Sequence, residues 1–538
     1  MNKKDLKNQA IIKLLIFIAI IVAVNVISTQ VFTRVDFTKN KTYTLSPISK
    51  DIVSKLDDKM VVKAYFSENL PAPYNNLRRQ VMDILSDYRT YSNGNLSYEF
   101  YNPTGEEKAD ELGQEAQKYG INPVQVQVVD KDKFEVKAAY MGMVFLYEGR
   151  QETIPFIQSI NNLEYEITSK IKNLSVKQKT VVGYLEGDGS LDITKLQQIS
   201  KGLGDQFELK PVSLGLNRAV PDEVKVLLVL GPTTVLSENK KYMLDQFVMR
   251  GGNVAWLIQK VTPNFQQQII IGNVIDDGLN DMLLNYGIKV ETDLIRDLQC
   301  GQVTVQSPIG IPIAVNYPFF PVVSNINKDI SSFANIPSVT LSFASSIDLN
   351  AVQGKDVKAD YLLKSSDRSG KAEGFFILNL EQFQNMNKQA ADTLFNKQGY
   401  VLGAVYNGRF KSFYAGKPVP TDTTEGSGPI MIQQLNESSK ESKMVVIGDA
   451  DFINEEQRPP QDNINFFLSM VEYLADDVGL AQIRSKESSD APIEDVTDGT
   501  KAFVKYFNLI FPPALMLIIG LIVWQRRNKR KKELQTSK

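Results

Sequence analysis

Two short acidic motifs carry the residues in this sequence that could do chemistry. Asp449 and Asp451 stand two residues apart, directly after the apolar run at 444–447. If that run is a strand of a parallel sheet, both carboxylates lie at its carboxyl end, where open α/β sheets place their binding sites. Two such carboxylates could bind a cation or serve as acid and base. The alternative, which we favour, is a turn whose Asp caps the next helix through backbone hydrogen bonds.

The second motif is a glycine-rich segment, Gly-Asp-Gly-Ser at 187–190, preceded by Glu186. It stands between an expected strand and an expected helix, which is the position of phosphate-binding loops. However, the third glycine of a dinucleotide fingerprint would fall at Asp192, and no Gly-Lys-Ser or Gly-Lys-Thr occurs in the chain. A plain strand-to-helix turn is therefore favoured, and an ATPase is not expected. Glu186 and Asp188 remain candidates for contact with a ligand or partner.

The chain contains no His and only one Cys, which narrows the chemistry further. Without His it cannot build a Ser-His-Asp or Cys-His pair, nor the His-containing sites that dominate zinc and non-haem iron chemistry. Cys300 cannot form an internal disulfide, and no basic residue adjoins it to stabilise a thiolate, so a buried or incidental role is favoured. No catalytic residue, metal ion or cofactor is therefore expected.

Length and charge limit the remaining classes of function. At 538 residues the chain exceeds the size of a single hydrophobic core, which predicts two or three folded units. The formal net charge is -2, and the Lys and Arg residues are spread widely. Because a phosphate backbone needs a concentrated basic face, nucleic acid is not expected as a partner.

The elements that must position these motifs alternate between strands and helices. In the first expected domain, 33–175, a helix over 74–91 lies between two strand-like runs, which is a β-α-β unit. A second helix is expected over 159–174. The expected strands of this domain are 61–66, 96–101, 124–129 and 138–147.

The second expected domain, 176–483, contains both acidic motifs. One of its helices is expected to end at Gly204, and another to begin at Ser237 and to end before Gly251 and Gly252. Because its strands alternate with helices, we expect a mainly parallel sheet covered on both faces. The expected strands are 181–185, 226–230, 254–258 and 444–447, followed by a helix near 466–474; the polar stretches 353–373 and 416–428 of the intervening insertion are expected to be surface loops.

Two apolar stretches are long enough to cross a membrane. The first, 10–32, carries one charge, Lys13, and lacks the small-residue pattern of a signal-peptide cleavage site. An uncleaved anchor is therefore favoured over a cleaved leader. The second, 505–525, follows a charged linker at 484–504 and precedes the basic tail at 526–538.

The charges that flank the two stretches predict their orientation. Three Lys residues lie in the N-terminal segment 1–9, and six Lys and Arg residues follow the second stretch. Cationic flanks stay in the cytoplasm, so both termini are expected there, with residues of about 33 to 505 on the other side. The expected fold class is thus α/β, with two extracytoplasmic α/β domains flanked by two transmembrane helices.

Several of these segments resemble one family. The stretch at 34–50 (RVDFTKNKTYTLSPISK) runs into 61–71 and is joined by Tyr-Leu-Glu-Gly-Asp-Gly at 184–189, by the Gly-Gly pair at 251–252 and by the segment 444–452. Together they look like the GldG family of ABC-transporter auxiliary proteins over nearly the whole chain. Many relatives would carry Glu-Gly-His-Gly-Glu where this chain has Glu-Gly-Asp-Gly-Ser, so any role of a His in that loop is absent here.

The resemblance implies a non-ATPase accessory subunit that works beside a permease and a separate ATPase in the bacterial inner membrane. It associates the chain with gliding motility and the secretion machinery that accompanies it. It also implies an α/β domain similar to the glutamine-amidotransferase-like fold, without the catalytic Cys and His of that fold.

Three functions are compatible with these observations. The favoured one is a non-catalytic interaction subunit, whose extracytoplasmic portion contacts a substrate, an envelope protein or a glycan while its spans dock on the permease in the lipid bilayer. The alternative is an extracytoplasmic receptor for a sugar or peptide, with its site in the sheet crevice beside Glu186, Asp188, Asp449 and Asp451. A carboxylate-dependent enzyme is the least favoured, because paired acids alone are weak evidence for catalysis.

Overall fold

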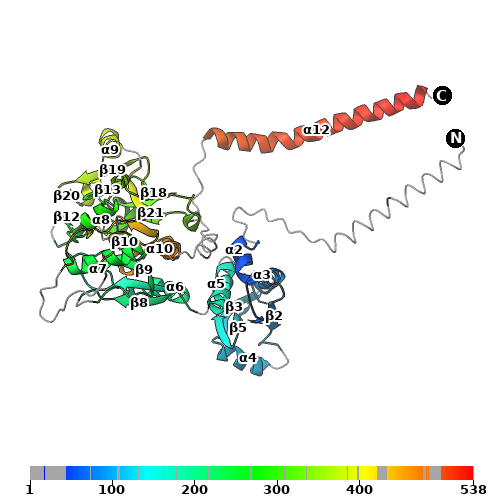
Figure 1. Cartoon of the computed structure of the whole chain (residues 1–538). Coiled ribbons are helices and arrows are strands. Elements are labelled where there is room, and N and C mark those ends of the chain that lie inside the picture. The colour runs from blue at the N-terminus through cyan, green and yellow to red at the C-terminus, as the bar shows by residue number, and fades with distance from the viewer. Residues whose placement is uncertain are drawn as a thin grey trace. The chain divides into compact units, whose positions relative to one another are not determined.

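The computed structural model describes most of the chain, and Figure 1 labels many of its helices and strands. The described residues are 17, 44–68, 70–72, 74–105, 109–130, 133–160, 163–176, 178–215, 218–266, 269–306, 310–334, 336–383, 386–396, 399–420, 433–475, 480, 483 and 498–536. The chain divides into two compact units, Met1–Ser488 and Ser489–Lys538. The expected N-terminal segment 1–9 and the first span, 10–32, lie outside the described residues apart from Phe17.

The N-terminal part of the first unit is built on a four-stranded sheet of order β2-β1-β5-β6. The expected β-α-β unit is present, because β1 and β2 pair in parallel and α3 connects them. Apolar side chains of α2, α3 and α5 pack on one face of this sheet, whereas α4 packs on the other. The bounds are α2 Pro47–Ser54, β1 Met60–Phe66, α3 Leu77–Tyr91, β2 Leu96–Tyr101, α4 Ala109–Lys118, β3 Val124–Asp130, β4 Lys133–Ala139, β5 Met141–Tyr147, β6 Arg150–Ile154 and α5 Leu163–Ser175.

The second and larger part contains an eight-stranded sheet of order β16-β18-β21-β22-β10-β9-β7-β8. The five strands from β22 to β8 are parallel, which confirms the expected mainly parallel sheet, and β21, β18 and β16 add an antiparallel extension. The bounds are β7 Val181–Leu185, β8 Glu208–Val212, β9 Val224–Leu230, β10 Asn253–Leu257, β16 Asn325–Ile326, β18 Val357–Lys364, β21 Val401–Gly408 and β22 Ser442–Ile447.

Helices cover both faces of this sheet. In β9, Val226, Leu228 and Leu230 point to the core shared with α6 and α10, while Leu227 and Val229 point to the core shared with α7 and α8. The strand reads as a continuous apolar run because neither face is exposed to water. The bounds are η1 Ile193–Lys195, α6 Gln197–Gln206, α7 Glu238–Met249, α8 Asn280–Tyr286 and α10 Gln461–Leu474.

The insertion between β10 and β22 forms smaller sheets around an aromatic core that includes Tyr317, Phe319, Phe343 and Phe376. The strands pair as β11-β12-β20, β13-β19 and β14-β15-β17. Their bounds are β11 Val261–Asn264, β12 Ile271–Val274, β13 Asp293–Asp297, β14 Cys300–Gln306, β15 Pro312–Val323, β17 Val339–Thr340, β19 Ser369–Glu373 and β20 Phe376–Ile377; short helices are η2 Ser331–Phe333, η3 Leu349–Val352, η4 Leu380–Phe383 and α9 Lys388–Leu394, with η5 Asp451–Ile453 and η6 Glu455–Gln457 after β22.

Three local expectations are wrong. The single strand expected at 138–147 is two strands, because the backbone of Tyr140 pairs with Ser67 and the chain passes from the β3-β4 hairpin to the main sheet there. The stretch 353–373 is not a loop but contains β18 and β19, whose polar residues alternate with buried ones. Finally, α6 continues past Gly204 to Gln206.

The second unit contains α12, Asp498–Thr536, which includes the expected second span. Its candidate membrane-spanning portion, Ala502–Lys529, has 28 residues; the most apolar window of 18 residues has a mean hydropathy of 2.1, and none of that window is buried. The linker expected to reach residue 504 is therefore helical from Asp498. Pro512 and Pro513 lie inside the helix rather than in its first turn, a position that membrane helices tolerate.

Candidate functional site

The glycine-rich segment forms the turn between β7 and the helices that follow it. Gly187, Asp188 and Gly189 all have positive φ, at 88°, 53° and 74°. The carbonyl of Asp188 accepts hydrogen bonds from the amides of Thr233 and Thr234 at 2.9 and 3.1 Å. Its carboxylate receives the ammonium group of Lys240 at 2.8 Å on both oxygens. These contacts fix a backbone that an Asp rarely adopts.

This turn closes the topological switch point of the sheet, where β8 and β9 lie on opposite sides of β7. A Cβ atom added at Gly189 would lie 1.8 Å from the Oγ1 atom of Thr233, so the loops after β7 and β9 touch there. Open α/β folds commonly bind ligands at such a point. In this chain the loops after β7 and β9 contact each other at that point through Gly189 and Thr233. Glu186 stays exposed beside the turn and accepts a hydrogen bond from the hydroxyl of Ser213 at 2.6 Å.

Asp449, after β22, is fully buried. Its two carboxylate oxygens accept hydrogen bonds from the backbone amides of Asp451, at 2.7 Å, and Ser342, at 2.6 Å. Burial raises the pKa of Asp449 well above its ordinary value, the charge of Asp451 adds to this, and the amide donors oppose it. The local turn that the sequence favours is present, but the N-cap position of η5 is Ala450, and Asp449 bonds the first amide of that short helix and the distant amide of Ser342.

Asp451 begins the short helix η5 and is partly buried. Burial raises its pKa, while hydrogen bonds with the side chains of Asn454 and Gln457 lower it. The turn beside it is tightly packed, since a Cβ atom added at Gly448 would lie 2.1 Å from the carbonyl oxygen of Ser345. Both carboxylates of this motif therefore act on the local backbone and its neighbours.

The two acidic motifs do not form one site. The strands β10 and β9 lie between β22 and β7. Neighbouring strands are about 4.8 Å apart, so the motifs are separated by roughly 14 Å. Within the ranges that the structure describes, no group of three or more His, Cys, Asp or Glu residues could hold a metal ion.

A buried cluster at the same edge of the sheet was not predicted from the sequence. The ammonium group of Lys260, after β10, lies 2.9 Å from a carboxylate oxygen of Asp277 and 2.7 Å from the side-chain oxygen of Asn280. Both charged side chains are at most 1% exposed. The ammonium group has two close acceptors, so the cluster holds the start of α8 against β10. No local signal predicts a pairing across 17 residues of irregular sequence.

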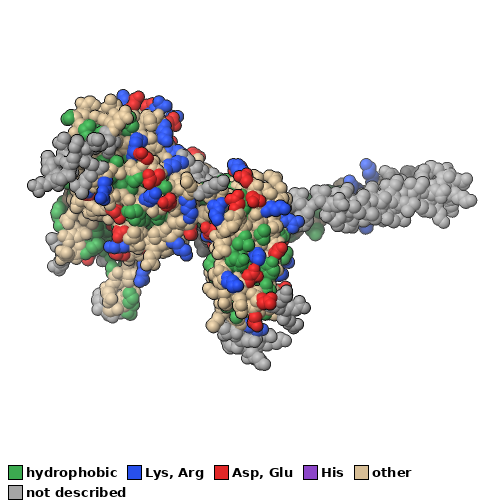
Figure 2. Space-filling view, turned by 60° about the horizontal axis from the view of Figure 1, so that its bottom comes forward, with side chains coloured by type: hydrophobic (Ala, Val, Ile, Leu, Met, Phe, Trp, Pro, Cys, Tyr) green, Lys and Arg blue, Asp and Glu red, His purple; other side chains and the backbone are tan. Residues whose placement is uncertain are grey.

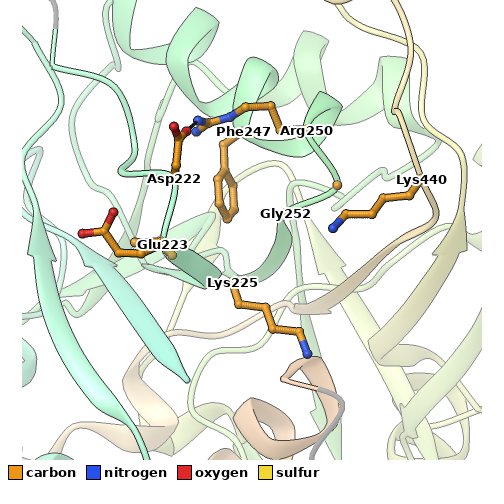
Figure 3. A pocket seen from close by; sticks show the side chains of 9 residues that line it. Asp222, Glu223, Lys225, Phe247, Arg250, Gly252 and Lys440 are labelled. Atoms are coloured by element: carbon orange, nitrogen blue, oxygen red, sulfur yellow. Dashed lines mark hydrogen bonds and ion pairs between the residues drawn. The ribbon is translucent and has the colours of Figure 1, made fainter. Parts of the chain in front are cut away.

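Two cavities lie at the opposite edge, where the parallel strands begin. One, shown in Figure 3, has a volume of about 180 Å³ and the other about 510 Å³. Asp222 and Arg250 line both of them. Their walls come from the segment before β9, the end of α7 and the segments flanking residue 440, which are far apart in the sequence and have no motif in common.

A family model described as an ABC-type uncharacterized transport system matches residues 179–470, more than half of the chain. The chain belongs to this family of ABC-transport auxiliary proteins. The matched region begins just before β7 and ends within α10, so it coincides with the domain of the eight-stranded sheet. A second model, a domain of unknown function, matches residues 39–146 and covers most of the N-terminal domain.

A relative of this auxiliary protein in Borreliella burgdorferi is an uncharacterized protein. It is 24% identical over 520 residues, covering 94% of this chain and 95% of the relative. Among solved structures, the mmIFT52 N-terminal domain aligns with 55% of this chain and 96% of its own length, at 13% identity and a TM-score of 0.32. A likeness at that score carries no argument about function.

Charges on the auxiliary protein are mixed rather than segregated. On the face that Figure 2 shows, Lys and Arg side chains are interspersed with Asp and Glu over the described surface. This distribution accords with the net charge of -2. Family membership points to an accessory role in ABC-type transport, a class of systems that contains a permease and an ATPase.

Proposed function

We propose that this chain is a non-catalytic, membrane-anchored auxiliary subunit of an ABC-type transport system. The observation that carries the proposal is that one chain contains both an α/β domain that matches the family model and the helix α12. The most apolar window of α12 is not buried against the rest of the chain. This segment of 28 residues is long enough to span a bilayer. Insertion would bury the apolar side chains that the folded chain leaves exposed.

The proposed topology is two-pass, in the bacterial inner membrane. The cationic residues after the second span and at the N-terminus support cytoplasmic termini, with the two α/β domains in the extracytoplasmic space. In this arrangement the spans dock on the permease, the separate ATPase works on the cytoplasmic side, and the outer domains meet a substrate, an envelope protein or a glycan. The resemblance to the GldG family further links the proposed role to gliding motility and secretion.

The non-catalytic part of the proposal rests on what the candidate carboxylates do. Asp188 pairs with Lys240, and Asp449 caps backbone amides while buried. Asp451 bonds to its neighbours, and Glu186 bonds to Ser213. Each of the four therefore has a structural partner, which supports a structural role for these carboxylates over a catalytic one.

Co-purification tests the assembly. The full chain, tagged and expressed at its native level, is purified in mild detergent, and bound proteins are identified by mass spectrometry. The expected result is recovery of a permease and an ATPase. Recovery of the chain alone, under conditions in which a known membrane complex stays intact, would contradict the proposal.

Topology is tested separately. A phosphatase reporter that is active only outside the cytoplasm, fused after Lys538, is expected to be inactive, while protease added to spheroplasts is expected to cleave the central region. An active reporter or a protected central region would overturn the orientation without affecting the family membership.

A further inference from the structure

The smaller cavity at the amino ends of β9 and β10 is built as a compact polar pocket (Figure 3). Its apolar wall is Phe247 from α7 together with Val224, the first residue of β9. The backbone of Gly252 lies against the ring of Phe247, because a Cβ atom there would come within 2.3 Å of it. Charged side chains of both signs complete the lining: Asp222, Glu223, Lys225, Arg250 and Lys440.

Two hydrogen-bond donors on this lining lack an acceptor among the residues that the structure describes. The guanidinium group of Arg250 bonds Asp222 and, at 2.7 Å, the carbonyl of Val220, but its Nε atom is buried and unpartnered. Lys440 is exposed, its stem lies over Gly251, and its ammonium group contacts none of the described acceptors. The Nε atom is shielded from solvent, so a ligand would reach this guanidinium group where the exposed Asp222 now bonds it, and the exposed ammonium group of Lys440 is directly open to a ligand.

A purely structural role accounts for only part of the lining. Lys225 donates to the carbonyl of Ala475 at 2.7 Å and thus satisfies the end of α10, and Arg250 follows the last residue of α7. Cations are favoured at helix carboxyl ends for this reason alone. That explanation does not account for the exposed ammonium group of Lys440, which has no partner among the described residues.

The charges select the kind of ligand. Three cations and two carboxylates line the pocket, which leaves one positive charge in excess. Asp222 pairs with Arg250, and Glu223 lies 3.3 Å from the ammonium group of Lys210, outside the pocket. The guanidinium group thus already accommodates one carboxylate, that of Asp222, whose side chain is 90% exposed and free to yield its place.

We propose that this pocket binds the carboxylate group of a small ligand, with Arg250 and Lys440 as the principal donors and Phe247 against the apolar part of the ligand. The volume of about 180 Å³ admits a group of this size but not a large cofactor. The site lies at the edge of the sheet opposite the acidic motifs, and the inference does not rest on the proposed auxiliary function.

Saturation-transfer NMR on the full chain in detergent micelles tests the site, because it detects weak ligands of large proteins. Acetate is the probe and acetamide, which has nearly the same shape but no charge, is its control. Transfer to acetate is expected to exceed that to acetamide. Lys440→Gln and Arg250→Gln should each weaken acetate binding about tenfold, since each removes a charge-assisted hydrogen bond.

Lys358→Gln is the matched control, because Lys358 on β18 is also exposed and lies outside the pocket. It should leave the acetate signal unchanged. Far-ultraviolet circular dichroism and the thermal midpoint establish that each variant is folded, and Lys440→Gln, at an exposed position, keeps the test valid if Arg250→Gln unfolds. Equal transfer to acetate and acetamide would overturn the proposal. An acetate signal in a folded Lys440→Gln variant that is as strong as in the natural chain would do the same.

Discussion

At the scale of single residues, the carboxyl group of Glu166 on α5 binds its proton more tightly in the folded chain than in the unfolded chain. Burial raises its pKa from the ordinary 4.5 to about 7, and the charge of Lys170 opposes this. Between those two values the folded state keeps a proton that the unfolded state has released. The free energy of unfolding therefore falls as the pH rises through this window, by up to about 3 kcal/mol.

Replacement of this carboxyl group should remove that part of the pH dependence. Glu166→Gln is expected to flatten the stability profile between pH 5 and pH 7 and to stabilise the chain at pH 8 by about 1–3 kcal/mol, since no charge is then buried. Urea unfolding at several pH values measures the effect. Glu111→Gln, at an exposed position on α4, is the control and should keep the slope of the natural chain. An unchanged slope in Glu166→Gln would contradict the prediction.

A single substitution at Asp449 can distinguish a structural role of this residue from a functional one. Because its carboxylate satisfies the buried amides of Ser342 and Asp451, Asp449→Ala should destabilise the domain by about 2–4 kcal/mol. Asp367→Ala, at an exposed position before β19, should change stability by less than about 0.5 kcal/mol. Thermal unfolding of both variants provides the comparison. A fully stable Asp449→Ala variant would return this residue to the candidates for a functional role.

At the scale of elements, the turn after β7 depends on two glycines for different reasons. Both have positive φ, but a Cβ atom at Gly187 would meet nothing within 4 Å, whereas one at Gly189 would collide with Thr233. Gly187→Ala should therefore cost about 1 kcal/mol for the backbone alone, and Gly189→Ala about 2–3 kcal/mol because the loops must also separate. Chemical unfolding of the pair measures the difference. Equal losses would mean that the β7 and β9 loops do not need to touch.

The membrane role of α12 can be tested near its midpoint. Leu517 lies within the apolar portion and is exposed in the folded chain. Leu517→Arg should reduce membrane insertion, since a charge at the centre of a span costs about 2.5–3.5 kcal/mol. Leu517→Ala, which shortens the side chain without charging it, should insert normally. Carbonate extraction of membranes separates inserted from released chain, and equal retention of both variants would argue against a spanning helix.

Elements proved more predictable from sequence than the contacts between them. β7 has the predicted bounds because a strand covered on both faces is a continuous apolar run, and α7 begins after Ser237, whose hydroxyl accepts the amide of Lys240. The break at Tyr140 was not predictable, because it depends on Ser67, 73 residues away. The bond from the amide of Asp451 to Asp449 followed from its residue type, whereas the bond from the distant amide of Ser342 did not. The pocket around Arg250 did not, because its lining comes from separate segments.

At the scale of the whole molecule, the two α/β domains are joined by a small polar junction. The side-chain amide of Gln206, at the end of α6, donates to the hydroxyl of Tyr165 on α5 at 2.6 Å and to a carboxylate oxygen of Glu472 on α10 at 2.9 Å. The side chain of Asn173 on α5 donates to the carbonyl of Asp205 at 2.6 Å. Neighbouring helices of the two domains thus exchange hydrogen bonds, and polar contacts of this kind are typical of interfaces between domains of one chain.

This junction should couple the stabilities of the two domains weakly but measurably. Tyr165→Phe removes only the hydroxyl that accepts the amide of Gln206, so a double-mutant cycle with Gln206→Ala should give a coupling energy of about 0.5–1.5 kcal/mol. The variants are compared by urea unfolding, with hydrogen exchange assigning each transition to a domain. Tyr361→Phe, on β18, is the matched control and should show no coupling with Gln206→Ala. A coupling energy of zero for Tyr165 and Gln206 would contradict the prediction, because it would mean that the two domains unfold without sensing this contact.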